Sequence, residues 1–169
     1  MESARCNLEL GNKRFVQATE WNDEIRIDVR EWELKDEKLI PTKKGISLPL
    51  HRWKLLVDNF EFLDQALAEK RVYQSHLGDN VYASVQIKSV CLDLRQHWLP
   101  PNNTEVVPTK KGICLRPAEY EKLKDVASVI GDFVPELCSI VPCPYSSDHQ
   151  NQLGFLTCSE FNPNHFTEW

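Results

Sequence analysis

Hydrophobic and polar residues alternate with a period of two in the first part of the chain. Ile25, Ile27 and Val29 are each separated by a charged residue, which is typical of a strand with one buried face. Residues 8–18 form another strand-like run with turn residues near its centre. We therefore expect one bent strand there, after a flexible start over residues 1–7.

Turn residues and a proline organise the next part of the chain. Asn22 and Asp23 suit a tight hairpin before the alternating strand. Residues 42–48 are predicted as a last strand, and Pro49 stands where a helix can begin. Apolar residues then recur at steps of three and four, which predicts a single amphipathic helix ending near residue 70. The stripe of this helix consists of Trp53, Leu56, Val57, Phe60, Leu63 and Leu67.

A six-residue segment occurs twice in the sequence. Pro-Thr-Lys-Lys-Gly-Ile spans residues 41–46 and returns at residues 108–113. Strand-like residues precede each copy and a helical stripe follows it, so an internal duplication is the simplest explanation. We predict an α+β protein of two β-β-β-β-α units, at residues 7–70 and 71–134, with an irregular tail at residues 135–169.

The size of each unit predicts how the two are arranged. A domain of about 60 residues buries only about 60% of its unfolded surface and is marginal alone. We therefore expect the two units to bury their apolar faces against each other as a pseudo-dimer within one chain. The connection near Lys70 and Arg71 is short. If it cannot span the distance, each unit must pair with a unit of another chain, which would give a homodimer.

Charge and hydropathy narrow the classes of partner. The net charge is −5, which argues against indiscriminate coating of nucleic acid. Residues 135–169 contain no Lys or Arg and four acidic residues, so the two units are nearly neutral, which still permits one basic face. No run approaches the roughly 20 apolar residues of a membrane span, and no signal peptide is recognisable, so we expect no membrane partner.

Cysteine and histidine residues raise the question of metal binding and catalysis. We expect the six cysteines to be reduced thiols, because they lack a regular framework. The tail holds soft ligands, but their spacing does not match the usual pairs of a structural zinc site. Zinc therefore stays an alternative to a loosely ordered or partner-docking tail, and we expect no cofactor. The scattered histidines do not support an enzyme. The tail residues concerned are Cys138, Cys143, His149, Cys158 and His165.

Two motifs resemble those of a known family. Ile-Asp-Val-Arg-Glu-Trp at residues 27–32 precedes Pro-Thr-Lys-Lys-Gly-Ile-Ser-Leu at residues 41–48, and residues 92–98 and 108–115 repeat both in part. This combination resembles the positive cofactor four family of transcriptional coactivators. The resemblance implies a twisted antiparallel four-stranded sheet with a C-terminal helix in each unit. It also implies pairing of the units, binding of single-stranded DNA and a location in the nucleus.

The resemblance also implies a set of nucleic-acid-binding residues. In the family, DNA is held by an aromatic residue at the first hairpin, by an arginine and an aromatic residue at the end of the next strand, and by the basic pair before Gly-Ile. In the first unit these positions are Trp21, Arg30, Trp32, Lys43 and Lys44, and in the second they are Arg95, Trp98, Lys110 and Lys111. The second unit has no aromatic counterpart of Trp21, so we expect the first unit to bind more strongly.

The side chains themselves support the same chemistry. Single-strand binders combine aromatic stacking surfaces, worth about 1–3 kcal/mol per base, with cations that follow the phosphates. Trp21 and Trp32 suit stacking, whereas we expect Trp53 on the helical stripe to be core. Asp28 and Asp93 are interpreted as structural partners of a nearby arginine or backbone group.

Single-stranded DNA is thus the expected partner, with RNA open as a variant and transcription machinery proteins as further candidates. The alternative function is a protein-interaction scaffold that has the same fold but weakened nucleic-acid binding. The near-neutral charge, the substituted second hairpin and the acidic, aromatic tail favour that alternative.

Overall fold

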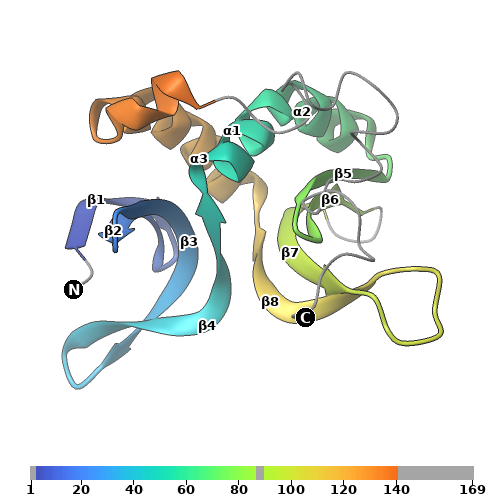
Figure 1. Cartoon of the computed structure of the whole chain (residues 1–169), viewed down its shortest axis with the longest axis horizontal. Coiled ribbons are helices and arrows are strands. Elements are labelled where there is room, and N and C mark those ends of the chain that lie inside the picture. Colours follow the sequence, from blue (N-terminus) through green and yellow to red (C-terminus); the bar gives the residue numbers. More distant parts are fainter. Residues whose placement is uncertain (1–2, 87–89, 141–169) are drawn as a thin grey trace.

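The computed structural model describes residues 3–86 and 90–140, which form two four-stranded antiparallel sheets (Figure 1). In each sheet the strands lie in the order of the sequence. The first sheet consists of β1 (Ser3–Gly11), β2 (Arg14–Trp21), β3 (Glu24–Lys35) and β4 (Lys38–Pro49). The second consists of β5 (Tyr73–Gly78), β6 (Val81–Val85), β7 (Leu92–Trp98) and β8 (Val107–Leu115). The predicted α+β architecture is confirmed.

Helices follow each sheet. The first sheet is followed by α1 (Leu50–Asp58) and α2 (Phe60–Glu69). The second is followed by α3 (Pro117–Val129) and by two short 3₁₀ turns, η1 (Ile130–Asp132) and η2 (Pro135–Ser139).

The prediction of a single helix in the first unit is wrong, because Asn59 divides it. The Asn59 side-chain amide donates to the carbonyl oxygen of Leu55 at 2.7 Å, and its Oδ1 accepts from the hydroxyl of Tyr73 at 3.0 Å. An asparagine amide that bonds to nearby backbone competes with the regular helical ladder. The stripe of apolar residues therefore continues across two helices instead of one.

The prediction of a flexible start and one bent strand is also wrong. β1 already begins at Ser3, and it pairs with β2 across a turn at Asn12 and Lys13. Both turn residues have positive φ, at 53° and 61°, so the bend is a tight hairpin turn. Cys6 is buried, which helps to fix the early part of β1. The hairpin predicted at residues 22–23 is confirmed.

The core lies between the inner face of each sheet and the helices. Ile27, Val29 and Leu48 are fully buried on the first sheet, and the residues between them face the other side. Trp53 is 1% exposed, which confirms its predicted place in the core. Alternation along the strands thus decides which face meets the helices.

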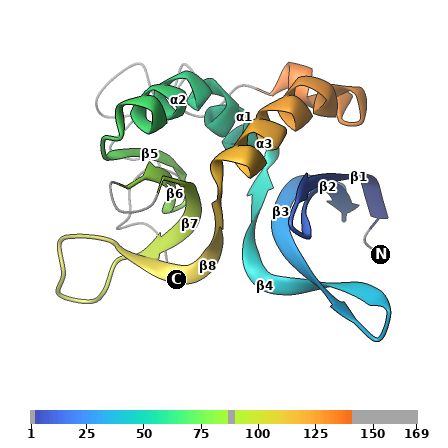
Figure 2. The same ribbon diagram turned by 180° about the vertical axis from the view of Figure 1, so that it is seen from behind.

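The two units pack together within one chain. Helix α3 of the second unit contacts β1 of the first sheet, while α1 and α2 contact β5 and β6 of the second sheet. The helices gather on one side. The edge strands of the two sheets, β4 and β8, run side by side where the units meet (Figures 1 and 2). The Tyr120 hydroxyl donates to the carbonyl oxygen of Phe60 at 3.2 Å and ties α3 to α2. This arrangement is the predicted pseudo-dimer; the unit boundaries at residues 70 and 134 stay predictions.

The first residues of the predicted irregular tail are packed. The Lys54 ammonium donates to the carbonyl oxygens of Leu137 and Ile140 at 2.8 and 2.6 Å. Arg5 pairs with Glu136 at 2.8 Å, which lowers the pKa of the Glu136 carboxyl. Four of the five candidate zinc ligands, all but Cys138, lie outside the described residues, as does the rest of the tail.

Cysteine chemistry differs from the sequence prediction. Cys91 and Cys114 form a disulfide, so the expectation of reduced thiols is wrong for this pair. Cys6 and Cys138 are free thiols. Within residues 3–86 and 90–140, no group of three His, Cys, Asp or Glu side chains is placed to hold a metal ion. None of the described helices is long and apolar enough to cross a membrane.

Candidate nucleic-acid interface

The repeated six-residue segment forms the same irregularity in both sheets. In the first sheet Arg30 lies opposite Gly45, and Trp32 lies opposite Pro41. One residue of β3 therefore faces three residues of β4, which makes an extended β-bulge. The second sheet repeats this register shift between β7 and β8. We call these two segments, residues 41–45 and 108–112, the bulges.

A threonine holds each bulge in the same way. The Thr42 hydroxyl donates to the carbonyl oxygen of Glu31 at 2.7 Å and accepts from the backbone N–H of Lys44 at 3.2 Å. Thr109 makes the corresponding bonds with Gln96 and Lys111 at the same distances. Identical sequence thus gives identical local geometry at two places in one chain.

An arginine from the neighbouring strand closes each bulge. The guanidinium of Arg30 donates to the Asp28 carboxylate at 3.0–3.3 Å and to the carbonyl oxygen of Thr42 at 2.8 Å. In the second sheet the same set of bonds joins Arg95, Asp93 and Thr109. The predicted pairing of each aspartate with an arginine is confirmed. Much of the hydrogen-bonding capacity of both guanidinium groups is therefore used within the fold.

The glycine of each bulge is required by close approach. A Cβ on Gly45 would lie 2.7 Å from Cγ of Arg30 and from the carbonyl oxygen of Val29. A Cβ on Gly112 would lie 2.6 Å from the carbonyl oxygen of Leu94. These distances are too short for any Cβ, so only glycine lets the arginine stem cross the bulge.

The bulges turn four lysines toward solvent where the two units meet. Lys43, Lys44, Lys110 and Lys111 are all exposed, and none has an ion pair with another described residue. Because β4 and β8 lie side by side, the two lysine pairs belong to one surface. We call this surface the cationic seam.

Two hollows along the cationic seam add further cations. The charged residues that line one of them, of about 410 Å³, are Arg26, Arg30, Lys43, Arg52, Lys111 and the acidic Asp79, which pairs with Arg52. Those that line the other, of about 500 Å³, are Arg14, Lys43, Lys44, Arg95, Lys110 and the acidic Glu31, which pairs with Arg14. The sequence prediction missed Arg14, Arg26 and Arg52, because they come from three different elements and belong to no shared motif. In both hollows the cations outnumber the acidic residues, which suits an anionic chain that runs along the seam.

The two predicted tryptophans of the first unit lie far apart. Trp32 is half-buried near the bulge, and its ring meets that of Phe15 edge to face at 6.1 Å. Trp21 is 55% exposed at the β2–β3 hairpin, where it pairs with Glu24. Glu24 and Arg30 are six residues apart on β3, so Trp21 is separated from the bulge by about 20 Å measured along the strand.

In the second unit the register places histidine where the first unit has tryptophan. His97 lies opposite Pro108, as Trp32 lies opposite Pro41. Trp98 is one residue further along, 36% exposed and paired with Val107, so it points away from the side on which His97 lies. The sequence prediction matched Trp98 to Trp32 and therefore overlooked His97. Trp98 is not among the described residues that line the two seam hollows with Arg95 and the lysines.

A tyrosine accompanies this histidine. Tyr82 pairs with Arg95 as Phe15 pairs with Arg30. The rings of Tyr82 and His97 meet at 4.6 Å, and burial raises the pKa of the Tyr82 hydroxyl and lowers the pKa of the His97 imidazole. The outer face of the second sheet thus has tyrosine and histidine where that of the first has the less polar phenylalanine and tryptophan.

Comparison with known proteins identifies the family of the chain. The family model described as transcriptional coactivator p15 (PC4) matches residues 8–59 and 88–126. An RNA polymerase II transcriptional coactivator of Arabidopsis thaliana, KIWI, is 41% identical over 64 residues, which cover 38% of this chain and 58% of that protein. An RNA polymerase II transcriptional coactivator of Drosophila melanogaster is 33% identical over 66 residues, which cover 39% of this chain and 60% of that protein. Because the family model covers more than half of the chain, the protein belongs to the PC4 family of transcriptional coactivators.

Proposed function

We propose that the protein binds single-stranded DNA along the cationic seam and acts in the nucleus, in transcription by RNA polymerase II. The observation that carries the proposal is the pair of identical bulges, which present four lysines without ion pairs among the described residues on one surface. The two relatives are RNA polymerase II transcriptional coactivators, which supports the role in transcription. A coactivator family is a family of binding proteins, so we expect binding rather than catalysis.

The roles of the individual side chains differ. Lys43, Lys44, Lys110 and Lys111 contact phosphates, while Arg30 and Arg95 chiefly hold the bulges in place. Trp32 with Phe15 offers a stacking surface beside the first bulge, and the exposed Trp21 offers another at the distant hairpin. A nucleic-acid strand that follows β3 from the seam to Trp21 must span several nucleotides, since the two sites are about 20 Å apart along β3.

A salt-titrated binding measurement with single-stranded and duplex DNA tests the proposal. We expect Lys43→Glu with Lys44→Glu to weaken single-strand binding about tenfold or more at low salt. Each lost phosphate contact also lowers the slope of log K against log salt by about 0.7. Lys122→Glu is the matched control, because Lys122 is an exposed lysine on α3, outside the residues that line the seam hollows. Undiminished binding in the double variant would remove the assignment.

The rival proposal is an interaction scaffold with weak nucleic-acid binding. It is favoured by the internal bonds of Arg30 and Arg95, which leave two of the predicted phosphate-binding groups partly occupied. Absence of single-strand binding at low salt, for DNA and for RNA, would favour the scaffold.

A further inference from the structure

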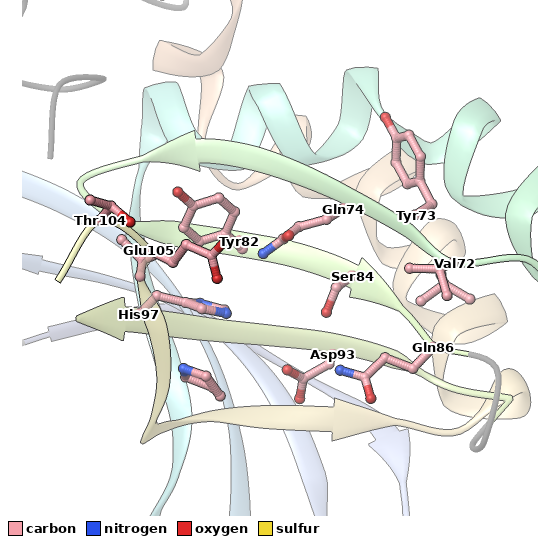
Figure 3. Close-up of a pocket in the computed structure, with 13 residues that line it drawn as sticks. Val72, Tyr73, Gln74, Tyr82, Ser84, Gln86, Asp93, His97, Thr104 and Glu105 are labelled. Carbon is pink, nitrogen blue, oxygen red and sulfur yellow. The ribbon is translucent and has the colours of Figure 1, made fainter. Parts of the chain in front are cut away.

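The outer face of the second sheet contains a hollow of about 540 Å³ that is separate from the cationic seam. Its sides come from β5, β6, β7 and the loop between β7 and β8 (Figure 3). Gln74, Ser84 and His97 reach it from the three strands, and Glu105 reaches it from the loop. A volume of this size is within the range of about 300–1,000 Å³ for pockets that hold small ligands.

His97 is the group that points to a ligand. It is 8% exposed, and its Nδ1 is itself buried and has no hydrogen-bond partner within the described part of the chain. Buried polar atoms are nearly always paired, so the unpaired Nδ1 beside the hollow would gain a partner if the ring turned toward a bound molecule. An imidazole nitrogen can donate or accept, depending on the tautomer. Figure 3 shows the ring beside Tyr82 and Glu105 at the same end of the hollow.

The charge of the hollow excludes phosphate as its ligand. No Lys or Arg is among the described residues that line it, whereas Asp93 and Glu105 are. Asp93 accepts hydrogen bonds from Arg95, but Glu105 has no ion pair among the described residues. A free carboxylate in such a hollow accepts from an amino group, as carboxylates do from the exocyclic amine of cytosine. Val72, Val106 and Pro108 supply apolar walls for a flat ring.

The position of the hollow links it to the cationic seam. Pro108 lines the hollow and begins the second bulge, and Lys110 follows two residues later on β8. These two residues are about 7 Å apart along the strand. A nucleic-acid strand whose phosphate contacts Lys110 therefore has this hollow beside it.

We propose that the hollow binds one nucleobase that carries an exocyclic amino group, with His97 and Glu105 bonded to the edge of the base. The inference rests on the proposed single-strand binding and adds a base preference to it. The first sheet cannot supply this preference, because Phe15 and Trp32 stand in the places of Tyr82 and His97. One half of the molecule thus stacks on any base, and the other half distinguishes between bases.

The test compares oligodeoxycytidine with oligodeoxyuridine of the same length, by fluorescence anisotropy at neutral pH and fixed salt. The exocyclic group of these bases is an amine in one and a carbonyl in the other. We expect the protein to bind oligodeoxycytidine about 3- to 10-fold more tightly, the factor that one net hydrogen bond supplies. Glu105→Gln and His97→Phe should each bring the ratio close to one, with little change in the affinity for oligodeoxyuridine.

The controls separate this inference from the proposed function. Gln17→Ala changes the first-sheet counterpart of Ser84 and should leave the ratio unchanged. Glu105 is exposed, so Glu105→Gln keeps the test informative if His97→Phe folds poorly. Equal affinity for the two oligonucleotides, or a preference that persists in both variants, would overturn the base-binding hollow alone. Binding to neither oligonucleotide would overturn the proposed function and the hollow with it.

Discussion

At the scale of single residues, the two bulge glycines do the most to shape the candidate site. Gly45 and Gly112 allow the stem of an arginine to cross the strand at a distance that no Cβ permits. The arginine then bonds to a carbonyl oxygen of the bulge and holds it open toward solvent. The lysines beside each glycine are exposed for this reason. A glycine with no chemistry of its own thus determines where the cations lie.

Substitution of these glycines provides the first prediction. Gly45→Ala and Gly112→Ala should each lower the free energy of unfolding by about 1–3 kcal/mol, because the new methyl group must displace backbone or the arginine stem. Urea denaturation measures this. Gly131→Ala is the matched control, because a Cβ there meets nothing within 4 Å, and it should be close to neutral. Equal effects at all three positions would contradict the close-approach argument.

At the scale of elements, the break between α1 and α2 sets how the helices cover the second sheet. The side chain of Asn59 donates to the carbonyl oxygen of Leu55 at the end of α1, and it accepts a hydrogen bond from the Tyr73 hydroxyl of β5. The chain therefore turns at Asn59 while α1 contacts β5 and α2 contacts β6. A single straight helix would not follow both strands of a twisted sheet equally well.

Removal of this side chain provides the second prediction. Asn59→Ala should cost about 1–2 kcal/mol of stability, because it leaves a half-buried tyrosine hydroxyl without its partner. Gln65→Ala is the control: its amide bonds to Glu69 on the exposed face of α2 and is worth only a few tenths of a kcal/mol. Thermal unfolding of both variants decides the matter, and a loss no larger for Asn59 than for Gln65 would refute it.

At the scale of the whole molecule, the two sides of the interface between the units are not equivalent. Arg14 of the first unit pairs with the buried Glu119 of the second at 2.9 Å and also donates to the carbonyl oxygen of Cys114. The counterpart of Arg14 is Val81, and the counterpart of Glu119 is Arg52, which pairs with Asp79 at 3.3 Å. If the first units of two different chains paired with each other, Arg14 of one would lie opposite Arg52 of the other. The charges therefore favour pairing of a first unit with a second one.

The buried pair provides the third prediction. Arg14→Met should destabilise the fold by about 3–5 kcal/mol, because it leaves Glu119 buried without its cation. Arg71→Met removes an arginine from an exposed pair with Glu69 and should cost no more than about 1 kcal/mol. Denaturant titration of the two variants compares them directly. If Arg14→Met is as mild as Arg71→Met, the pair does not hold the units together.

What can be determined from the sequence is what depends on near neighbours. The duplication, the alternating strand around Ile27, the buried Trp53 and the pairing of Asp28 with an arginine all follow from local periodicity or from a repeated motif. The likeness to PC4-type coactivators rests on the same segments. Each of these features depends on residues a few positions apart, where pattern and structure correspond directly.

The tertiary structure alone decided the features that depend on pairing between distant segments. The three-residue bulge and the way it aims the lysines are seen only in the strand register, although His97, like Trp32, stands two residues after its arginine in the sequence. Arg14, Arg26 and Arg52 come to the seam hollows from β2, β3 and α1. The asymmetry of Arg14 with Glu119 likewise exists only once the two units pack. Strand register and packing between units are set by long-range contacts, so local sequence patterns cannot specify them.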